Sequence, residues 1–304
     1  MSTKSILITN ATGNQGTAVI DALVGQPGFT LLAATRDSTS RKAQALQSKG
    51  NNVVLVQGHL DDVPALFASA RQASPTGQVW GVFSLQLSMG KGVTHEGEIR
   101  QGKALVDEGR KAGVTHFVYS SVDRGGDEKS WENPTSVQHF QSKHEIEHYL
   151  RDHADGMGWT VLRPVAFMDG LNPDFASQVF IAALRDTLGS KPMQWVATSD
   201  IGMFAKFAFE KPGDWNNQAI GLAGDELTHQ QLSDVFLRTT GRALDGTFGI
   251  LGRVLKYMVS DMGAMMNWFA SDGYGANIAR LRKIHPGMLD FEHWIRQSGR
   301  FPTV

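Results

Sequence analysis

The sequence has no cysteine among its 304 residues, which excludes disulfide bonds and thiol-based redox switching. It also has no run of about 18 apolar residues, so we expect no segment that spans a membrane. Its 29 lysine and arginine residues almost balance its 30 aspartate and glutamate residues. With a net charge of −1, a broad positive field that would hold nucleic acid is not expected. These absences favour a soluble cytoplasmic protein, with the nucleus as an alternative location, that binds neither membranes nor nucleic acid directly.

A small-residue turn near the start of the chain is the first positive signal. Residues 6–8 form a short apolar run typical of a buried parallel strand, and the apolar spacing of residues 18–23 predicts a helix. A strand that turns at glycines into a helix directs backbone N–H groups and the positive end of the helix dipole at one point, which suits a pyrophosphate. The spacing is that of G-x-x-G-x-x-G, with Asn10 in place of the first glycine and Gly13 and Gly16 in the other positions. Asn tolerates left-handed backbone, so we favour nucleotide binding over an ordinary strand–helix turn.

Strand and helix patterns alternate along the first half of the chain, without internal repeats. Short apolar runs predict further strands at residues 29–34, 53–56, 79–84, 116–120 and 160–163. Helical patterns predict helices at residues 40–49, 63–73, 98–112 and from about 136 onward. Repeated β-α units imply an α/β protein with a doubly wound parallel sheet and helices on both faces. In such a sheet, ligands bind at the carboxyl ends of the strands.

The pattern becomes irregular after the last of these strands. Residues 218–222 are predicted to add one more strand, and residues 228–239 an amphipathic helix with Thr228 as its N-cap. The remainder is mostly helical in pattern and rich in aromatic residues. We therefore expect a nucleotide-binding domain over residues 1–165 and a smaller, mainly helical C-terminal lobe over residues 166–304. No flexible linker marks the boundary, and the chain is expected to return from the lobe to the sheet near residues 218–222.

The end of the second predicted strand indicates which dinucleotide is bound. NAD-binding folds place an acidic residue there that bonds the ribose 2′-hydroxyl, whereas NADP-binding folds place a basic residue near the 2′-phosphate. This chain has Thr35-Arg36-Asp37, followed by Arg41 and Lys42 at the start of the next helix. A guanidinium can hold a phosphate through two parallel hydrogen bonds, which favours NADP(H) over NAD(H). Asp37 is the counter-evidence, and a solvated surface arginine is the alternative interpretation.

Five short segments carry a family resemblance. They are Asn-Ala-Thr-Gly-Asn-Gln-Gly at residues 10–16, Ala34-Thr35-Arg36, Gln101-Gly102-Lys103, Phe117-Val118-Tyr119-Ser120-Ser121 and His139-Phe140-Gln141-Ser142-Lys143. Together they resemble the NmrA-like branch of the atypical short-chain dehydrogenases over roughly residues 4–240. The resemblance implies an NADP-binding Rossmann-like fold with a small C-terminal lobe. Members of that branch are divided between regulators that respond to the nucleotide and reductases of small molecules.

The resemblance also implies, position by position, which residues surround a bound NADP(H). The pyrophosphate is expected at the turn formed by Asn10, Ala11, Thr12, Gly13, Asn14, Gln15 and Gly16. The 2′-phosphate is expected at Arg36, with Arg41 nearby, and the adenine is expected beside His59 and Leu60. The nicotinamide half is expected beside Leu85, Gln86 and Leu87, with Lys143 on its ribose and Ala166, Phe167, Met168 and Asp169 over its carboxamide. The last third of the chain departs from the family pattern.

Whether such a site is catalytic depends on a proton donor. Active short-chain dehydrogenases use Tyr-x-x-x-Lys, in which the lysine lowers the pKa of the tyrosine so that its hydroxyl can pass a proton. Here His139 takes the place of the tyrosine before Lys143, and a nearby ammonium disfavours the imidazolium that would donate the proton. Ser120 and Ser121 stand where such enzymes keep a substrate-orienting serine, although a strand-end turn would also place serines there. These four residues are the candidate catalytic residues.

Residues 144–148 match H-E-x-x-H, which on a helix can place two imidazoles on zinc. At about 100° per residue, Ile146 and Glu147 share a face with Lys143, and the two histidines lie to its side. No convincing third ligand follows in the sequence. We therefore interpret the segment as a charged surface helix and predict no metal site.

The segment at residues 257–269 holds four of the eleven methionines of the chain. Methionine is a flexible apolar filler, so a helix in the core of the lobe is the interpretation that we favour. If the segment is exposed, it is a candidate surface for a protein partner or a hydrophobic substrate.

Two functions are consistent with these patterns. The first is an NADP(H)-binding regulator whose bound nucleotide biases a protein–protein contact, and the missing tyrosine and the family resemblance favour it. Because the chain lacks cysteine, such a regulator would sense redox state through the nucleotide. The second is an NADPH-dependent reductase of a small apolar carbonyl or enone, supported by Lys143, the two serines and the aromatic lobe. The sequence favours the first function.

Overall fold

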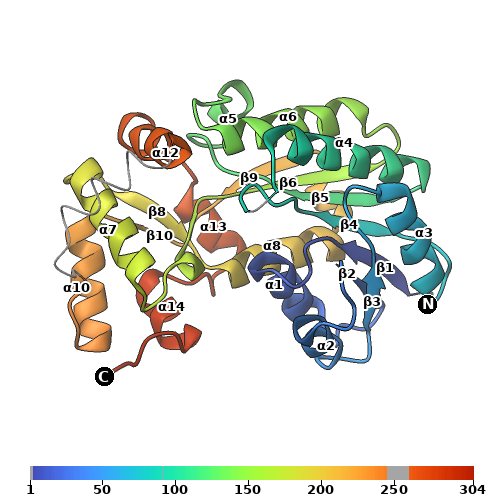
Figure 1. Ribbon diagram of the computed structural model, residues 1–304, viewed down its shortest axis with the longest axis horizontal. Helices are drawn as coiled ribbons and strands as arrows, with labels where there is room; N and C mark the ends of the chain where they lie inside the picture. Colours follow the sequence, from blue (N-terminus) through green and yellow to red (C-terminus); the bar gives the residue numbers. More distant parts are fainter. Residues whose placement is uncertain (1–2, 91, 245–259) are drawn as a thin grey trace. The chain divides into compact units, whose positions relative to one another are not determined.

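The computed structural model describes residues 3–90, 92–244 and 260–304 (Figure 1). The chain divides into two compact units, which we call the first and the second unit. The first unit comprises Met1–Ser121, Ser142–Arg163 and Ile201–Ile220, and the second comprises Val122–Gln141, Pro164–Asp200 and Gly221–Val304. The chain thus passes several times between the units. The division into domains at residue 165 stays a prediction.

A seven-stranded sheet organises the first unit. Its strands are β1 (Lys4–Ile8), β2 (Phe29–Thr35), β3 (Val53–Gln57), β4 (Gly81–Ser84), β5 (His116–Ser120), β6 (Gly158–Pro164) and β9 (Gln218–Leu222), in the order β3-β2-β1-β4-β5-β6-β9. The pairings from β3 through to β6 are parallel. Most of their residues are apolar and buried because helices cover both faces of the sheet. The chain builds outward from β1 on one side and then returns to place β4 on the other, which opens a crevice between the ends of β1 and β4.

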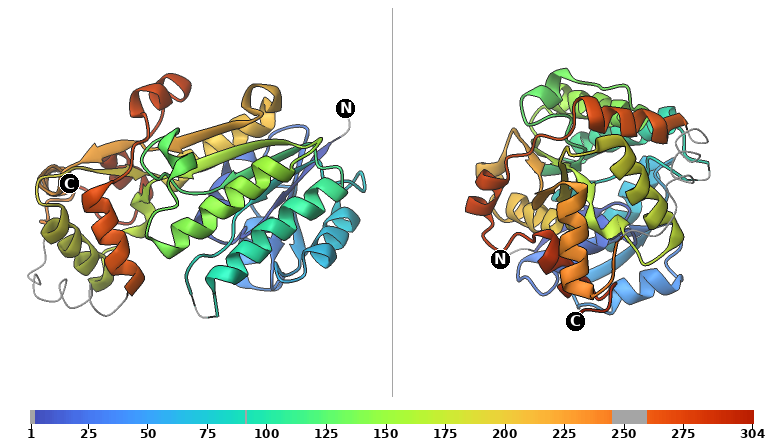
Figure 2. Two further views of the ribbon diagram at one scale, coloured as in Figure 1. Left: turned by 90° about the horizontal axis from the view of Figure 1, so that it is seen from above. Right: turned by 90° about the vertical axis from the view of Figure 1, so that its left-hand side faces the viewer.

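Helices cover this sheet on both faces. They are α1 (Asn14–Leu23), α2 (Arg41–Gln47), α3 (Val63–Ala73), α4 (His95–Lys111), α6 (Gln138–His153), α8 (Thr198–Glu210) and the short α9 (Pro212–Trp215). Figure 1 shows α4 and α6 along one face and α1 and α8 along the other. The view from above in Figure 2 shows α6, α4 and α3 side by side. On the opposite face α8 packs directly onto α1, because a Cβ atom at Gly202 would collide with the backbone of Ala18.

The second unit contains a small sheet and most of the C-terminal helices. Strands β7 (Ala166–Phe167), β8 (Met193–Val196) and β10 (Asp225–Leu227) pair in the order β10-β8-β7. The helices are α5 (Lys129–Glu132), the 3₁₀ helix η1 (Met168–Gly170), α7 (Phe175–Leu188), α10 (His229–Thr240), α12 (Ser260–Ser271), α13 (Ile278–Ile284) and α14 (Phe291–Ser298). A separate aromatic core that includes Trp195, Met266 and Phe291 holds these elements together.

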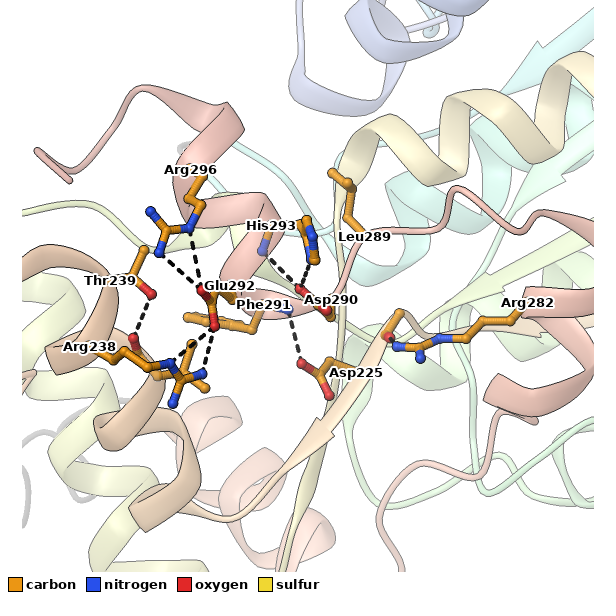
Figure 3. Close-up of polar contacts among 12 residues, drawn as sticks. Asp225, Arg238, Thr239, Arg282, Leu289, Asp290, Phe291, Glu292, His293 and Arg296 are labelled. Atoms are coloured by element: carbon orange, nitrogen blue, oxygen red, sulfur yellow. Dashed lines mark hydrogen bonds and ion pairs between the residues drawn. The ribbon is translucent and has the colours of Figure 1, made fainter. Parts of the chain in front are cut away.

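Polar contacts fix α14 beside α10 in the second unit. Figure 3 shows Glu292 between Arg238 of α10 and Arg296 of α14, and its carboxylate accepts hydrogen bonds from both guanidinium groups. The backbone N–H of Phe291 donates to the carboxylate of Asp225 at the start of β10. These contacts are partly exposed, so they orient α14 while the buried aromatic side chains supply most of its stability.

The predicted fold class is confirmed, including the parallel sheet and the helical C-terminal part. The strands at residues 116–120 and 218–222 have the predicted bounds, and Thr228 caps α10 through a complete capping box. The predicted helix at residues 98–112 begins earlier, at His95, because the side chain of Thr94 accepts the backbone N–H of Gly97. The small sheet of the second unit was not predicted, since its strands are only two to four residues long.

The methionine-rich segment forms part of α12. Met266 is fully buried, and Met265 packs against the core of the second unit. The interpretation as a core helix is therefore confirmed over the residues whose side chains the structure describes, while residues 257–259 lie outside the described residues. Among the described helices, none combines the length and the apolar character that crossing a membrane would require.

Candidate functional site

The turn after β1 adopts the conformation that its sequence predicts. Asn10 has a φ of 49°, in the left-handed region that the first glycine of the pattern would otherwise occupy. Its carbonyl oxygen accepts the backbone N–H of Gly13 at 2.9 Å. A Cβ atom at Gly16 would collide with that same carbonyl, so only glycine allows α1 to pack this closely against the turn. Gly13 is the N-cap of α1 and supplies no side-chain cap, which leaves the first N–H groups of the helix available to a ligand.

A cavity of about 650 Å³ opens at the carboxyl ends of β1 to β4, and we call it the strand-end cavity. All of its lining residues belong to the first unit. Its volume lies in the range of about 300–1,000 Å³ that is usual for small-molecule sites. Eight of the residues proposed from sequence line it: Asn10, Thr12, Arg36, Arg41, His59, Leu60, Leu85 and Leu87. Residues separated by up to 77 positions in the sequence are therefore brought to one site.

Other proposed cofactor residues lie near this cavity without lining it in the described structure. Ala11 and Gln15 are buried in the turn, and Gly13, Asn14 and Gly16 form its exit into α1. Gln86 is buried, and its side-chain amide donates to Ser84 Oγ at 2.9 Å. Thr9, which the sequence did not single out, joins the ends of β1 and β4 because its hydroxyl donates to the carbonyl of Leu85 at 2.9 Å.

Three cations stand at one end of the strand-end cavity. Arg36 directly follows β2, and Arg41 and Lys42 occupy the first turn of α2. All three side chains are exposed, and none forms an ion pair within the described residues. Asp37 does not neutralise them directly, since its carboxylate accepts the backbone N–H of Thr39 at 2.8 Å and its hydroxyl at 2.6 Å. These bonds lower the pKa of Asp37 and hold its charge within its own loop. The arrangement suits an anionic group with several oxygen atoms.

A second polar group that the sequence did not reveal also lines the cavity. Asp61 accepts hydrogen bonds from Gln101 Nε2 at 2.8 Å and from Arg100 at 3.1 Å, and the first of these contributes most to lowering the pKa of its carboxyl group. The bonds tie the loop after β3 to α4. His59 lies in the same loop, with its Nδ1 atom 3.1 Å from the Asp61 carboxylate. The loop that carries His59 and Leu60 is thereby held in place beside the cavity.

Lys143 does not line the cavity among the described residues, but its ion-pair partner does. The Nζ atom of Lys143 lies 2.8 Å from Oε1 of Glu98, and their side chains are 10% and 1% exposed. Ser88 and Ser142 also donate to the Glu98 carboxylate, at 2.9 and 2.6 Å. Glu98 lines the strand-end cavity from the first turn of α4. No sequence pattern distinguishes this residue beyond its position within a helix.

The other candidate catalytic residues belong to different units, Ser120 and Ser121 to the first and His139 to the second. Ser120 is buried and donates to Gln15 Oε1 at 2.5 Å, and Ser121 is buried with its backbone N–H bonded to the carbonyl of Leu162. His139 is half-buried in the second unit, and its ring packs edge-on against Phe140 with 4.7 Å between ring centroids. Catalytic roles for these residues stay predictions.

The four residues expected over the nicotinamide carboxamide belong to the second unit. Ala166 and Phe167 form β7, and Met168 and Asp169 begin η1. Met168 is fully buried, and the carboxylate of Asp169 accepts the backbone N–H of Thr198 at 2.7 Å. Their predicted role stays a prediction.

The H-E-x-x-H segment lies on α6. Ile146 and Glu147 are buried together with Lys143, so the predicted face is confirmed. His144 and His148 are half-buried, with 4.3 Å between their ring centroids. Within residues 3–90, 92–244 and 260–304, no group of three or more potential metal ligands occurs.

A parallel sheet with a crossover beside β1, a glycine turn into α1 and a cavity at the strand ends define a dinucleotide-binding type of α/β fold. Comparison with protein families makes this specific. The model of the NmrA-like family matches residues 2–295, and the chain belongs to that family. The resemblance seen in the short sequence segments is therefore confirmed.

The names of individual relatives refer to two different functions, an oxidoreductase and a regulator. The chain is 27% identical over 256 residues to the NmrA-like family domain-containing oxidoreductase hkm9 of Aspergillus hancockii, covering 79% of this chain and 73% of the relative. It is 28% identical to the nitrogen metabolite repression protein nmr of Neurospora crassa, covering 79% of this chain and 53% of the relative. The structure is similar to that of NmrA, a negative transcriptional regulator, in complex with NADP, with a TM-score of 0.72 and 21% identity. The match covers 98% of this chain and 95% of the NmrA chain. NmrA has also been crystallised with NAD, and that structure has a TM-score of 0.71. At this identity the likeness shows the fold alone.

Proposed function

We propose that the protein binds NADP(H) in the strand-end cavity and prefers it to NAD(H). The observation that carries the proposal is the cluster of Arg36, Arg41 and Lys42 at the end of β2. In this fold the ribose of the adenosine half lies at that strand end, where a 2′-phosphate would meet all three cations. Asp37 also lines the cavity, but its Oδ1 atom accepts both hydrogen bonds from Thr39, so that oxygen is not available to a 2′-hydroxyl. Since NmrA is known in complex with both NADP and NAD, it is these cations that support the preference.

The remaining contacts follow from the path of an extended dinucleotide. The turn from Asn10 to Gly16 and the open N-terminus of α1 would receive the pyrophosphate. His59 and Leu60 would flank the adenine, and Leu85 and Leu87 would contact the nicotinamide half. Lys143, which is paired with Glu98 and does not itself line the cavity in the described part of the chain, would bind the nicotinamide ribose.

We further propose that the protein reads the nucleotide rather than turning over a substrate. The proton donor of short-chain dehydrogenases is replaced by His139, and the positive charge of Lys143 is already balanced by the Glu98 carboxylate at 2.8 Å. A paired ammonium is a poor device for lowering the pKa of a neighbouring proton donor. A bound nucleotide would then act by biasing a contact with a regulatory protein. The likeness to the nitrogen metabolite repression protein of Neurospora crassa agrees with this proposal.

A reductase is the second candidate. The relative named as an oxidoreductase in Aspergillus hancockii favours it, and so does the retention of Lys143 with Ser120 and Ser121 at the end of β5. In that case NADPH would reduce a small apolar carbonyl or enone, and His139 would supply the proton.

Stopped-flow oxidation of bound NADPH separates the two candidates. The protein is loaded with NADPH and mixed with a panel of quinones, enones and aldehydes, while nicotinamide absorbance is followed. If the protein only reads the nucleotide, bound NADPH is oxidised no faster than NADPH in the absence of protein. Rapid oxidation in the wild type that is lost in His139→Ala would establish the reductase instead.

A further inference from the structure

The carboxylate of Glu98 collects three donors from two separate parts of the first unit. Its Oε1 atom accepts from Lys143 Nζ at 2.8 Å and from Ser88 Oγ at 2.9 Å, and its Oε2 atom accepts from Ser142 Oγ at 2.6 Å. Ser88 follows β4, while Ser142 and Lys143 are neighbours on α6. Glu98 is only 2% exposed, so nearly all of its hydrogen-bonding capacity is used inside the protein.

The position of Glu98 is fixed by the helix on which it lies. It lies in the first turn of α4, whose N-cap Thr94 accepts the backbone N–H of Gly97. A negative charge near a helix N-terminus is favoured by the helix dipole, and a buried carboxylate is tolerated because it is paired and hydrogen-bonded. Glu98 therefore forms a rigid anchor at the wall of the strand-end cavity.

We propose that Glu98 is a positioning residue for Lys143 at the nicotinamide ribose. This inference rests on the proposed binding of NADP(H). An ammonium group has three N–H donors, and Glu98 receives one of them. The ion pair holds Nζ in one place and so fixes the direction of its two remaining N–H donors. The lysine can then bond the ribose hydroxyls without the entropy cost of being immobilised on binding. Ser142 and Ser88 in turn fix the carboxylate. Glu98 thus acts on the nucleotide through Lys143.

A purely structural role is the alternative, in which the ion pair only holds α4 against α6. The chain offers a matched control for that role. Lys103 of α4 and Glu145 of α6 form a second ion pair between the same two helices, with 2.6 Å between Nζ and Oε1. Their side chains are 32% and 49% exposed, and neither residue lines the strand-end cavity within the described part of the chain.

The test uses one ligand that reaches Lys143 and one that does not. NADP⁺ carries the nicotinamide ribose, whereas 2′,5′-ADP carries only the adenosine half with its phosphates. Calorimetry measures both affinities in the full-length wild type and in Glu98→Gln, Lys143→Met, the double variant and Glu145→Gln. We expect Glu98→Gln to weaken NADP⁺ binding about tenfold, the usual worth of one hydrogen bond to a charged group, and to leave 2′,5′-ADP binding unchanged. The double variant is expected to bind NADP⁺ no more weakly than Lys143→Met, because Glu98 acts through the lysine.

Glu145→Gln is expected to leave both affinities unchanged. If Glu98→Gln does not fold, two other variants replace it. The double variant leaves no unpaired buried charge, and Glu98→Asp keeps the charge but withdraws it by one methylene. For Glu98→Asp we expect a smaller loss of NADP⁺ affinity with 2′,5′-ADP unaffected. An unchanged NADP⁺ affinity in Glu98→Gln or Glu98→Asp, or an equal loss for both ligands, would overturn the inference. A wild type that binds neither ligand would instead overturn the proposed function.

Discussion

Lys143 Nζ lies 2.8 Å from Oε1 of Glu98, a residue that lines the strand-end cavity, and both side chains are nearly withdrawn from solvent. The lysine that short-chain dehydrogenases use beside their catalytic tyrosine is therefore charge-balanced in this protein. This pairing supports the proposal that Lys143 binds the nucleotide rather than activating a proton donor.

Variants of the two α6 residues at positions 139 and 143 should therefore behave differently. Lys143→Ala is expected to weaken NADP(H) binding by about tenfold or more, because donors to the nicotinamide ribose are lost. His139→Ala is expected to leave nucleotide affinity and the slow background oxidation of NADPH unchanged. If His139 were a general acid, its removal would lower kcat by about 10²–10⁴ at constant nucleotide affinity. Fluorescence titration with NADPH and steady-state kinetics distinguish these outcomes.

A fully buried ion pair stabilises the same helix against the sheet. Arg163 of β6 donates to Glu147 of α6 with 2.7 Å between Nη2 and Oε2, and neither side chain is exposed. Glu147→Gln leaves a buried guanidinium with a neutral partner and is expected to lower the free energy of unfolding by about 3–5 kcal/mol. Glu145→Gln, also on α6, breaks an exposed pair with Lys103 of α4 and is expected to cost less than about 1 kcal/mol. Urea titrations measure both, and equal losses would contradict the assignment of the buried pair.

The acid sensitivity of the first unit should depend on His116. Burial lowers the pKa of His116 from 6.5 to about 4, and its ring lies 2.9 Å from Thr160 Oγ1. The folded protein keeps this histidine neutral, whereas the unfolded chain takes up a proton as the pH falls below 6.5. The contribution is therefore fully present above pH 6.5 and is lost as the pH falls toward 4.

His116→Gln should accordingly flatten the pH dependence of stability between these limits. The slope of the unfolding free energy is expected to fall by up to about 1.4 kcal/mol per pH unit, the value for one proton. Asp200 acts in the opposite sense, because burial raises its pKa to about 7 and its contribution to stability is lost as the pH rises. The quantity to compare is therefore the difference in slope between wild type and variant. A slope that His116→Gln leaves unchanged would show that this histidine titrates normally in the fold.

Much of the first unit was predictable because its signals are local. The buried parallel strands are continuous apolar runs, and the turn after β1 depends on residues within seven positions of one another. The cations at the end of β2 are likewise close in sequence. For this reason Asn10, Arg36 and Arg41 were identified from sequence and are found at one cavity.

The rest depends on contacts between distant residues. Glu98 is one of 30 acidic residues, and its partner Lys143 lies on another helix, so no local pattern distinguishes it. Asp61 is identified only by its bonds to Arg100 and Gln101, about 40 positions further along the chain. The strand Met193–Val196 is too short to carry a periodic signal, and it forms because aromatic side chains around Trp195 are buried.

The central claim is that the strand-end cavity is an NADP(H) site selected by cations at the end of β2. Arg36 is the first of these cations, and Arg71, an exposed arginine of α3 outside the cavity lining, serves as the control. One charge-assisted contact is worth about 1.5–3 kcal/mol, which corresponds to roughly ten- to a hundredfold in affinity. Arg36→Ala should therefore reduce the preference for NADP⁺ over NAD⁺ by that factor, and Arg71→Ala should leave it unchanged.

Calorimetric titration of the wild-type protein with NADP⁺ and with NAD⁺ measures this preference. We expect NADP⁺ to bind at least about tenfold more tightly than NAD⁺, and the difference to shrink in Arg36→Ala. Equal affinities of the wild type for the two nucleotides would contradict it.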